Sequence, residues 1–216
     1  MRTIGWHYEE ARQRIDALLR PLPDDRWLAD VPACPGWRVR DVLAHLVGNT
    51  EDGAAGRITG IPTPELTDAQ VARHRDDAPL DLLELWSLTG PFVAEAVTGA
   101  DMWPAAIDAV THEHDLRGAL GDTGGRDTES IRTFASMFAL DVAEQVPVVF
   151  ELDGVALGTA ENPDTPVLRT SSFEFFRARM GRRSRDQVLA FDWTGDPGPV
   201  LDHFFVFDPS AGPLSG

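Results

Sequence analysis

A change of sequence pattern near residue 146 constrains the fold most. Before it, apolar residues recur at the three- and four-residue intervals of amphipathic helices. After it, VPVVFELDGVALGTA contains two β-rich runs around Asp153-Gly154, a pair typical of a tight hairpin turn. We therefore predict an α+β chain, mainly α, with a helical domain over 1–145 and a small α+β domain over 146–216.

Apolar spacing also places the individual helices. In WRVRDVLAHLVG, one stripe is formed by Val39, Val42, Leu43 and Leu46. The apolar segment over 79–99 contains Gly90-Pro91, where we predict a break or a kink. Helices are predicted over residues 3–20, 37–48, 65–75, 79–99, about 101–120, 128–145, 182–193 and 199–207, with a loop over 53–64. The segment VLRTSSFEFFRARMG begins like a strand and continues as a helix that ends at Gly181.

The charge composition excludes several classes of function. A formal net charge of -16 argues against nucleic-acid binding, because contacts to phosphates need a basic surface. All 19 basic residues are arginine, which excludes lysine Schiff-base chemistry and a Walker-type phosphate loop. No apolar run is long enough to span a membrane, and the N-terminus is too polar for a signal peptide. We expect a cytoplasmic protein that binds neither nucleic acid nor membrane.

Cys34 is the only cysteine, so the chain cannot form an intrachain disulfide. A lone cysteine can be a nucleophile, but it is more commonly a small, buried apolar residue. Pro35 and Gly36 predict a turn directly after it, and no base stands beside it in the sequence. We therefore expect Cys34 to be a buried packing residue.

The stretch THEHDLRGALG, residues 111–121, raises the question of a metal site. On a helix, successive residues are turned by about 100°, so His112 and His114 point to opposite sides. Asp108 and His112 are four residues apart and share a face. Asp115 flanks the same face, where it can orient His112 as an outer partner. The alternative is a pair of surface polar residues beside a core histidine.

A catalytic zinc site usually has three protein ligands, so a third is needed. His45 lies on the predicted helix over 37–48, at the margin of its apolar stripe and beside Asp41. A histidine in that position faces the interior of a helical bundle from a second helix. On the helical geometry, Glu113 and His114 point elsewhere.

Three segments together carry a family resemblance: CPGWRVRDVLAHL, the helix with D-x3-H-x2-D that runs into RGALG, and FEFFRARMGRRSRDQV followed by FDWTGDP. They resemble the mycothiol-dependent maleylpyruvate isomerase-like proteins of actinobacteria. The resemblance covers about residues 5–206. It implies a DinB-like four-helix bundle that holds a divalent metal, followed by a smaller α+β domain.

The resemblance also implies a ligand set. The histidine that closes PGW-x3-D-x3-H is His45, and the carboxylate and histidine four apart on the later helix are Asp108 and His112. This sequence departs from the family pattern, which has glutamate where Asp108 stands. Glu113 and His114 remain possible substitutes. Two imidazoles and one carboxylate favour zinc.

The second domain holds a cluster of arginines within an acidic chain. In the family, the C-terminal part helps to form the cleft for the thiol cofactor and the substrate. Guanidinium groups grip carboxylates through two hydrogen bonds, so Arg179, Arg182 and Arg183 are the candidate cofactor-binding residues. The alternative is a solvated helix face that pairs with nearby acidic residues.

The resemblance implies a metal-dependent enzyme that uses mycothiol as cosubstrate on a small electrophilic, acidic molecule, as an isomerase or an S-transferase. One alternative is a metal-dependent hydrolase with Asp41 or Asp115 as its base. Another is a non-catalytic bundle that binds a metal or ligand. The sequence leaves the substrate and the oligomeric state open.

Overall fold

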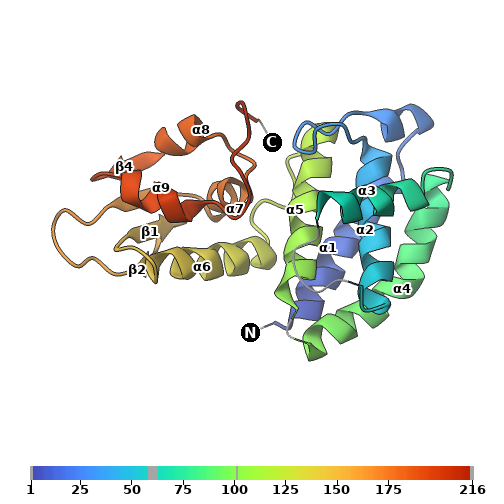
Figure 1. Ribbon diagram of the computed structural model, residues 1–216, viewed down its shortest axis with the longest axis horizontal. Helices are drawn as coiled ribbons and strands as arrows, with labels where there is room; N and C mark the ends of the chain where they lie inside the picture. Colours follow the sequence, from blue (N-terminus) through green and yellow to red (C-terminus); the bar gives the residue numbers. More distant parts are fainter. Residues whose placement is uncertain (1, 58–62, 101, 215–216) are drawn as a thin grey trace. The chain divides into compact units, whose positions relative to one another are not determined.

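The computed structural model describes residues 2–57, 63–100 and 102–214. By the contacts within it, the chain divides into two compact units, Met1–Thr123 and Gly124–Ser215. The first unit is helical, and the second combines helices with a sheet (Figure 1). The predicted mainly α, α+β class is therefore confirmed.

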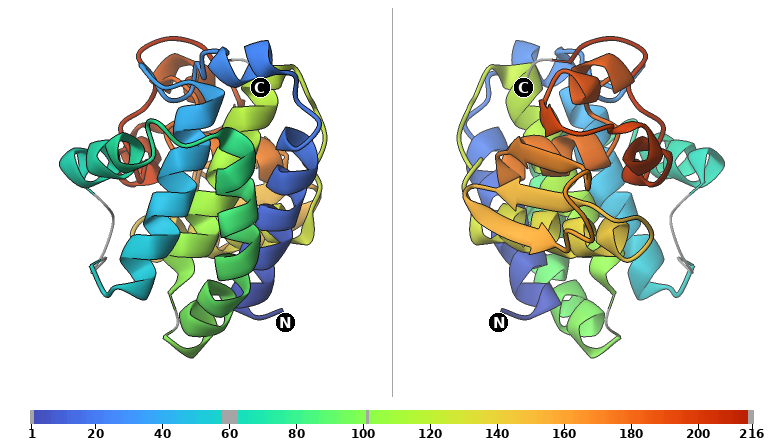
Figure 2. Two further views of the ribbon diagram at one scale, coloured as in Figure 1. Left: turned by 90° about the vertical axis from the view of Figure 1, so that its right-hand side faces the viewer. Right: turned by 90° about the vertical axis from the view of Figure 1, so that its left-hand side faces the viewer.

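Four long helices build the first unit. α1 packs against α4 and α5, and α2 packs against the same two helices, so the four surround one core (Figures 1 and 2). α3 packs on α2, and a short 3-10 helix, η1, also contacts α2. The elements are α1 (Ile4–Leu19), η1 (Asp24–Leu28), α2 (Val39–Ala54), α3 (Pro64–Arg73), α4 (Pro79–Gly99) and α5 (Trp103–Leu120).

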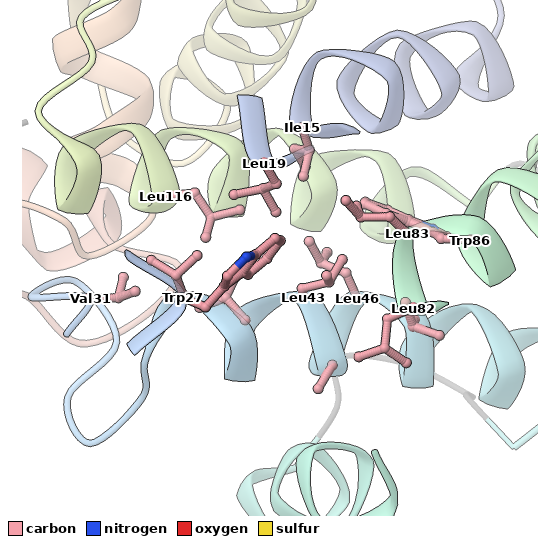
Figure 3. Packing of buried hydrophobic residues seen from close by; sticks show 14 residues of the cluster. Ile15, Leu19, Trp27, Val31, Leu43, Leu46, Leu82, Leu83, Trp86 and Leu116 are labelled. Carbon is pink, nitrogen blue, oxygen red and sulfur yellow. The ribbon is translucent and has the colours of Figure 1, made fainter. Parts of the chain in front are cut away.

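Aliphatic residues and two tryptophans fill the core of this unit (Figure 3). The predicted stripe of α2 faces it, and all four of its residues are at most 3% exposed. Trp27, from η1, lies beside Leu19 and Leu116 at one end of the core. Burial of such side chains is worth about 1.5–3 kcal/mol each, which holds α2 and α5 in fixed positions.

α4 continues through Gly90-Pro91, so of the predicted break or kink the break is absent, and the kink stays a prediction. Proline removes one helical hydrogen bond and crowds the preceding turn. The helix persists because it packs along α1 and α2. Gly90 has a packing role, since a Cβ there would lie 2.4 Å from Cδ of Arg12.

The second unit contains a four-stranded sheet in the order β2-β1-β3-β4. β1 pairs antiparallel with β2 and parallel with β3, and β3 pairs antiparallel with β4. Asp153 (φ 49°) and Gly154 (φ 83°) form the two-residue turn between β1 and β2, which confirms the predicted hairpin. The helix predicted over 182–193 is too long, because its last residues belong to the strand β4. The strands are β1 (Val149–Leu152), β2 (Val155–Gly158), β3 (Val167–Thr170) and β4 (Asp192–Thr194).

The helix predicted over 128–145 packs in the second unit, as α6 against β1, β2 and α7. The observed division therefore lies at residues 123 and 124 rather than at 145. The apolar face of α6 packs on the aromatic core of the second unit. Phe134 of α6 stacks on Phe176 of α7 with ring centroids 6.2 Å apart. The helices are α6 (Glu129–Ala143), α7 (Ser172–Arg179), α8 (Arg185–Leu189) and α9 (Gly198–Phe204).

Two sequence expectations fall partly outside the described residues. The predicted loop over 53–64 includes residues 58–62, and the predicted helix start includes Asp101. Among the residues that the structure describes, no helix is both long enough and apolar enough to cross a membrane.

Candidate metal centre

Three potential metal ligands meet inside the four-helix unit, His45 from α2 and Asp108 and His112 from α5. His45 Nε2 lies 3.4 Å from Asp108 Oδ2, and His112 Nε2 lies 3.5 Å from Asp108 Oδ1. One ligand atom from each residue lies within 4.8 Å of the other two. The structure thus brings together the three residues that the sequence singles out.

Local structure explains this meeting. Asp108 and His112 are one helical turn apart, so their side chains share a face of α5. His45 lies at the margin of the buried stripe of α2 and is itself 2% exposed, so its ring points into the bundle. Because α2 packs on α5, the two faces meet.

A second hydrogen bond fixes which nitrogen of His45 faces Asp108. His45 Nδ1 lies 2.8 Å from Gln70 Oε1, and Gln70 Nε2 donates to Asp52 Oδ2 at 2.8 Å. Asp52 is fully buried and paired with Arg57 and Arg73, so the amide of Gln70 is held with its oxygen towards the ring. That oxygen accepts only, so Nδ1 carries the proton and Nε2 presents a lone pair.

His112 is held in the same way from its other side. Its Nδ1 lies 3.0 Å from Asp115 Oδ2, and Asp115 is 1% exposed. A proton on Nδ1 is donated to that carboxylate, so Nε2 presents its lone pair to Asp108. Asp115 therefore contacts His112 as helical geometry predicts, and its role as the outer partner of a metal ligand stays a prediction.

When both rings are neutral, these hydrogen bonds leave two imidazole lone pairs facing a carboxylate. Such an arrangement is favourable when a cation, either a proton or a metal ion, lies between the three groups. In a tetrahedral zinc site with bonds of about 2.1 Å, ligand atoms lie about 3.4 Å apart. The two nitrogens lie at similar separations, 3.4 and 3.5 Å, from the two different oxygens of Asp108, and the residue types are ones that bind a divalent ion.

The electrostatics of the centre follow from this arrangement. Burial raises the pKa of Asp108, but the charges of His45 and His112 and hydrogen bonds outweigh it and lower the pKa to about 2. Burial lowers the pKa of His45, but Asp108 and Gln70 outweigh it, so the net shift is upward. A cation near the two imidazoles therefore stabilises the charged carboxylate.

Two more side chains complete the surroundings of the centre. Asn49, one turn after His45 on α2, donates its amide to Asp108 Oδ2 at 2.9 Å. Trp37 lies over both imidazoles, with ring centroids 5.2 Å from His45 and 6.4 Å from His112. The Asn49 amide thus holds the carboxylate, and the indole packs beside both imidazole rings.

Cys34 packs against the core of the helical unit, as the sequence predicts, but it is not fully buried. It is partly exposed, and its Sγ lies 3.4 Å from Asp115 Oδ2 and 3.8 Å from His112 Nδ1. The turn at Gly36 (φ 86°) reverses the chain, so a residue far from α5 in sequence comes to lie against it. Spatial neighbours of this kind cannot be found by scanning adjacent positions.

Several other candidates have structural partners. Asp41 accepts a hydrogen bond of 2.8 Å from the Arg38 backbone N–H and caps α2. Glu113 is fully buried and ion-paired with Arg14 and Arg117, at 2.8 and 3.0 Å. It faces α1, so it does not replace Asp108. His114 is 2% exposed, outside the three-residue cluster.

The three candidate cofactor-binding arginines make contacts within their own unit. Arg179 is 5% exposed, donates to the carbonyls of His203 and Phe204 at 2.6 Å each, and pairs with Asp141. Burial lowers its pKa, with Asp141 acting in the opposite direction. A role in tertiary structure accounts for these bonds, and its cofactor-binding role stays a prediction.

The other two arginines have partners as well. Arg183 pairs with Glu174 at 2.7 Å and is 4% exposed, and Arg182 donates to the Met180 carbonyl at 2.7 Å. Arg179 and Arg183 are buried and paired with acidic residues, and Arg182 is partly buried, so these three do not form a solvated face. Anion binding by Arg182 and Arg183 also stays a prediction.

Comparison with known proteins bears on the fold and the family. Among curated proteins, none matches the chain significantly. A crystal structure of the mycothiol-dependent maleylpyruvate isomerase has a TM-score of 0.57 at 18% identity, and a histidine-to-alanine mutant of it has 0.56 at 17%. Each comparison covers 84% of this chain and 92% of that one, and shows a shared fold.

The family follows from the sequence match. The mycothiol maleylpyruvate isomerase N-terminal domain matches residues 8–120, which include α2, α4, α5, most of α1 and all three candidate ligands. This is more than half of the chain, and it confirms the resemblance carried by the PGW and HEHDLRGALG segments. The chain therefore belongs to the family of the mycothiol maleylpyruvate isomerase N-terminal domain.

Proposed function

We propose that this protein is a metal-dependent enzyme that uses a low-molecular-weight thiol, mycothiol, to transform a small electrophilic molecule. The reaction is of the isomerase or S-transferase type, and we place it in the cytoplasm. The observation that carries the proposal is the convergence of two imidazole nitrogens and one carboxylate, whose ligand atoms lie within 4.8 Å of one another. The family match and the solved relatives support it.

His45, Asp108 and His112 would hold the ion, and zinc suits two nitrogens and one carboxylate oxygen. When bound, the ion supplies the positive charge that keeps a thiol deprotonated near neutral pH. Gln70 and Asp115 keep the Nδ1 proton on each imidazole and so aim both Nε2 atoms inward. Trp37 restricts the access of water to the rings.

The candidate bases for the hydrolytic alternative are already engaged. Asp41 caps α2, and Asp115 holds His112 while also accepting from Cys34. A thiol cosubstrate supplies its own nucleophile, so it needs neither a lysine, which the chain lacks, nor an additional protein base. These contacts favour the thiol-dependent reaction over hydrolysis.

The test measures zinc content and turnover together. Chelator-treated protein is reloaded with zinc and assayed on a panel of small electrophiles, including unsaturated acids, with and without low-molecular-weight thiols. We expect turnover that requires both zinc and a thiol. Turnover without thiol would support the hydrolase, and failure to take up zinc would support a non-catalytic bundle.

A further inference from the structure

A second group of metal-ligating atoms adjoins the candidate centre. It consists of Cys34 Sγ, His112 Nδ1 and Asp115 Oδ2, which lie within 4.8 Å of one another. We propose that these three residues form an alternative cation site for a thiophilic divalent ion such as zinc, cadmium or cobalt(II). The site is distinct from the first centre, although the two share the ring of His112.

The distances within this group suit one ion. Cys34 Sγ is 3.4 Å from Asp115 Oδ2 and 3.8 Å from His112 Nδ1, and the latter two atoms are 3.0 Å apart. In a tetrahedral zinc site with one sulfur, one nitrogen and one oxygen ligand, bond lengths of about 2.0–2.3 Å place the ligands about 3.4–3.6 Å apart. Each separation therefore needs a shift of about 0.4 Å or less.

The three residues are held in place by their surroundings. The Cys34 backbone N–H donates to the Val31 carbonyl, and the Cys34 carbonyl accepts from the Trp37 N–H, both at 2.9 Å. His112 and Asp115 are three residues apart on α5. Asp115 is 1% exposed while Cys34 is partly exposed, so an ion can approach from the sulfur side.

The ligand charges also suit a divalent ion. A thiolate and the Asp115 carboxylate together carry two negative charges, which a divalent cation neutralises. Thiolate and imidazole are ligands that favour zinc and other thiophilic ions over magnesium or calcium. The sulfur of Cys34 therefore sets the preference of this site for thiophilic ions.

Sharing His112 makes the two sites compete. A neutral imidazole carries one proton, so it offers a lone pair from one nitrogen at a time. When Nε2 serves the first centre, Nδ1 keeps its proton and donates to Asp115. When Nδ1 serves Cys34 and Asp115, Nε2 carries the proton and faces Asp108. An excess of thiophilic ions therefore draws His112 away from the first centre.

Cobalt(II) binding to the full chain, without added thiol, tests the proposal. A cobalt–thiolate bond gives a near-ultraviolet charge-transfer band, and Cys34 is the only cysteine that can produce it. We expect the band in chelator-treated wild-type protein titrated with cobalt(II). It should disappear in Cys34→Ser and Cys34→Ala, and remain at least as strong in His45→Gln, which removes the competing centre.

Each other outcome overturns the proposal. Absence of the band at saturating cobalt(II) means that Cys34 is not a ligand. A band that His45→Gln abolishes means that the sulfur serves the first ion instead. Circular dichroism checks that the variants are folded. Cobalt binding by Cys34→Ser measures the first centre by itself, so failure of the proposed function is separable from failure of this site.

Discussion

His45 and Gln70 are joined by a 2.8 Å contact between Nδ1 and Oε1, which turns the other nitrogen of the buried ring towards Asp108. The two residues come from different helices, α2 and α3. The amide is itself held by the buried Asp52. α3 therefore contributes to the candidate centre without supplying a ligand.

Replacing Gln70 by leucine should weaken zinc binding by about 10–100-fold, the usual effect of losing an outer partner of a metal ligand. The imidazole would then lose the acceptor that fixes its proton on Nδ1. The measurement is zinc affinity by competition with a chromophoric chelator. Gln13→Leu makes the same change at an exposed position of α1 and should leave the affinity unchanged. Equal affinities in the two variants would show that Gln70 does not orient His45.

Replacing Asp108 by glutamate should lower zinc affinity, although glutamate is the residue in the family pattern. The Asp108 carboxylate already lies 3.4 and 3.5 Å from the two Nε2 atoms and accepts from Asn49. One more methylene would move it by about 1.5 Å, towards or past the imidazoles. Asp76→Glu adds the same methylene at an exposed position and serves as control. Tighter zinc binding in Asp108→Glu would show that the shorter side chain impairs the site.

Loss of charge at Glu113 should mainly lower the free energy of unfolding, whereas loss of charge at Asp108 should mainly lower zinc affinity. Glu113→Gln leaves Arg14 and Arg117 without their buried carboxylate, which should cost about 3–5 kcal/mol of unfolding free energy. Zinc affinity of the folded variant should stay unchanged. Asp108→Asn should instead lose zinc affinity with a smaller loss of stability. Urea unfolding and zinc competition on both variants make the comparison, and a loss of zinc binding in Glu113→Gln would contradict it.

The stability of the metal-free protein should fall as the pH rises above 6.5. The pKa of His45 is raised above its ordinary value of 6.5, because Asp108 and Gln70 outweigh burial. A histidine whose pKa is higher in the folded than in the unfolded protein stabilises the fold at pH values below its unfolded-state pKa. This contribution is lost as the pH rises through its folded-state pKa. Urea unfolding on both sides of pH 6.5 should show the decline, with a smaller one in Asp108→Asn. An equal decline in both proteins would exclude His45 as its cause.

The three candidate ligands could be predicted because each rests on a local pattern. Asp108 and His112 share a helical face, and His45 lies at the margin of a buried stripe. Asn49 carried a similar signal, four residues after His45 on the same helix. Gln70 and Cys34 carried none, because tertiary packing of α3 and of the turn at Gly36 brings them to the centre.

The fold shows the same contrast between local and tertiary causes. The hairpin at Asp153-Gly154 follows from backbone preferences of the turn itself. The continuity of α4 through Pro91 and the packing of α6 with the sheet depend on partners distant in sequence. Periodicity identifies an apolar face but does not identify what covers it.

Zinc stoichiometry in a Cys34→Ser background tests the central claim most directly, because that background removes the competing sulfur ligand. We predict one zinc per chain in Cys34→Ser and none in the folded double variants that add His45→Gln or His112→Asn. Full zinc occupancy in either double variant would contradict a centre built from His45, Asp108 and His112.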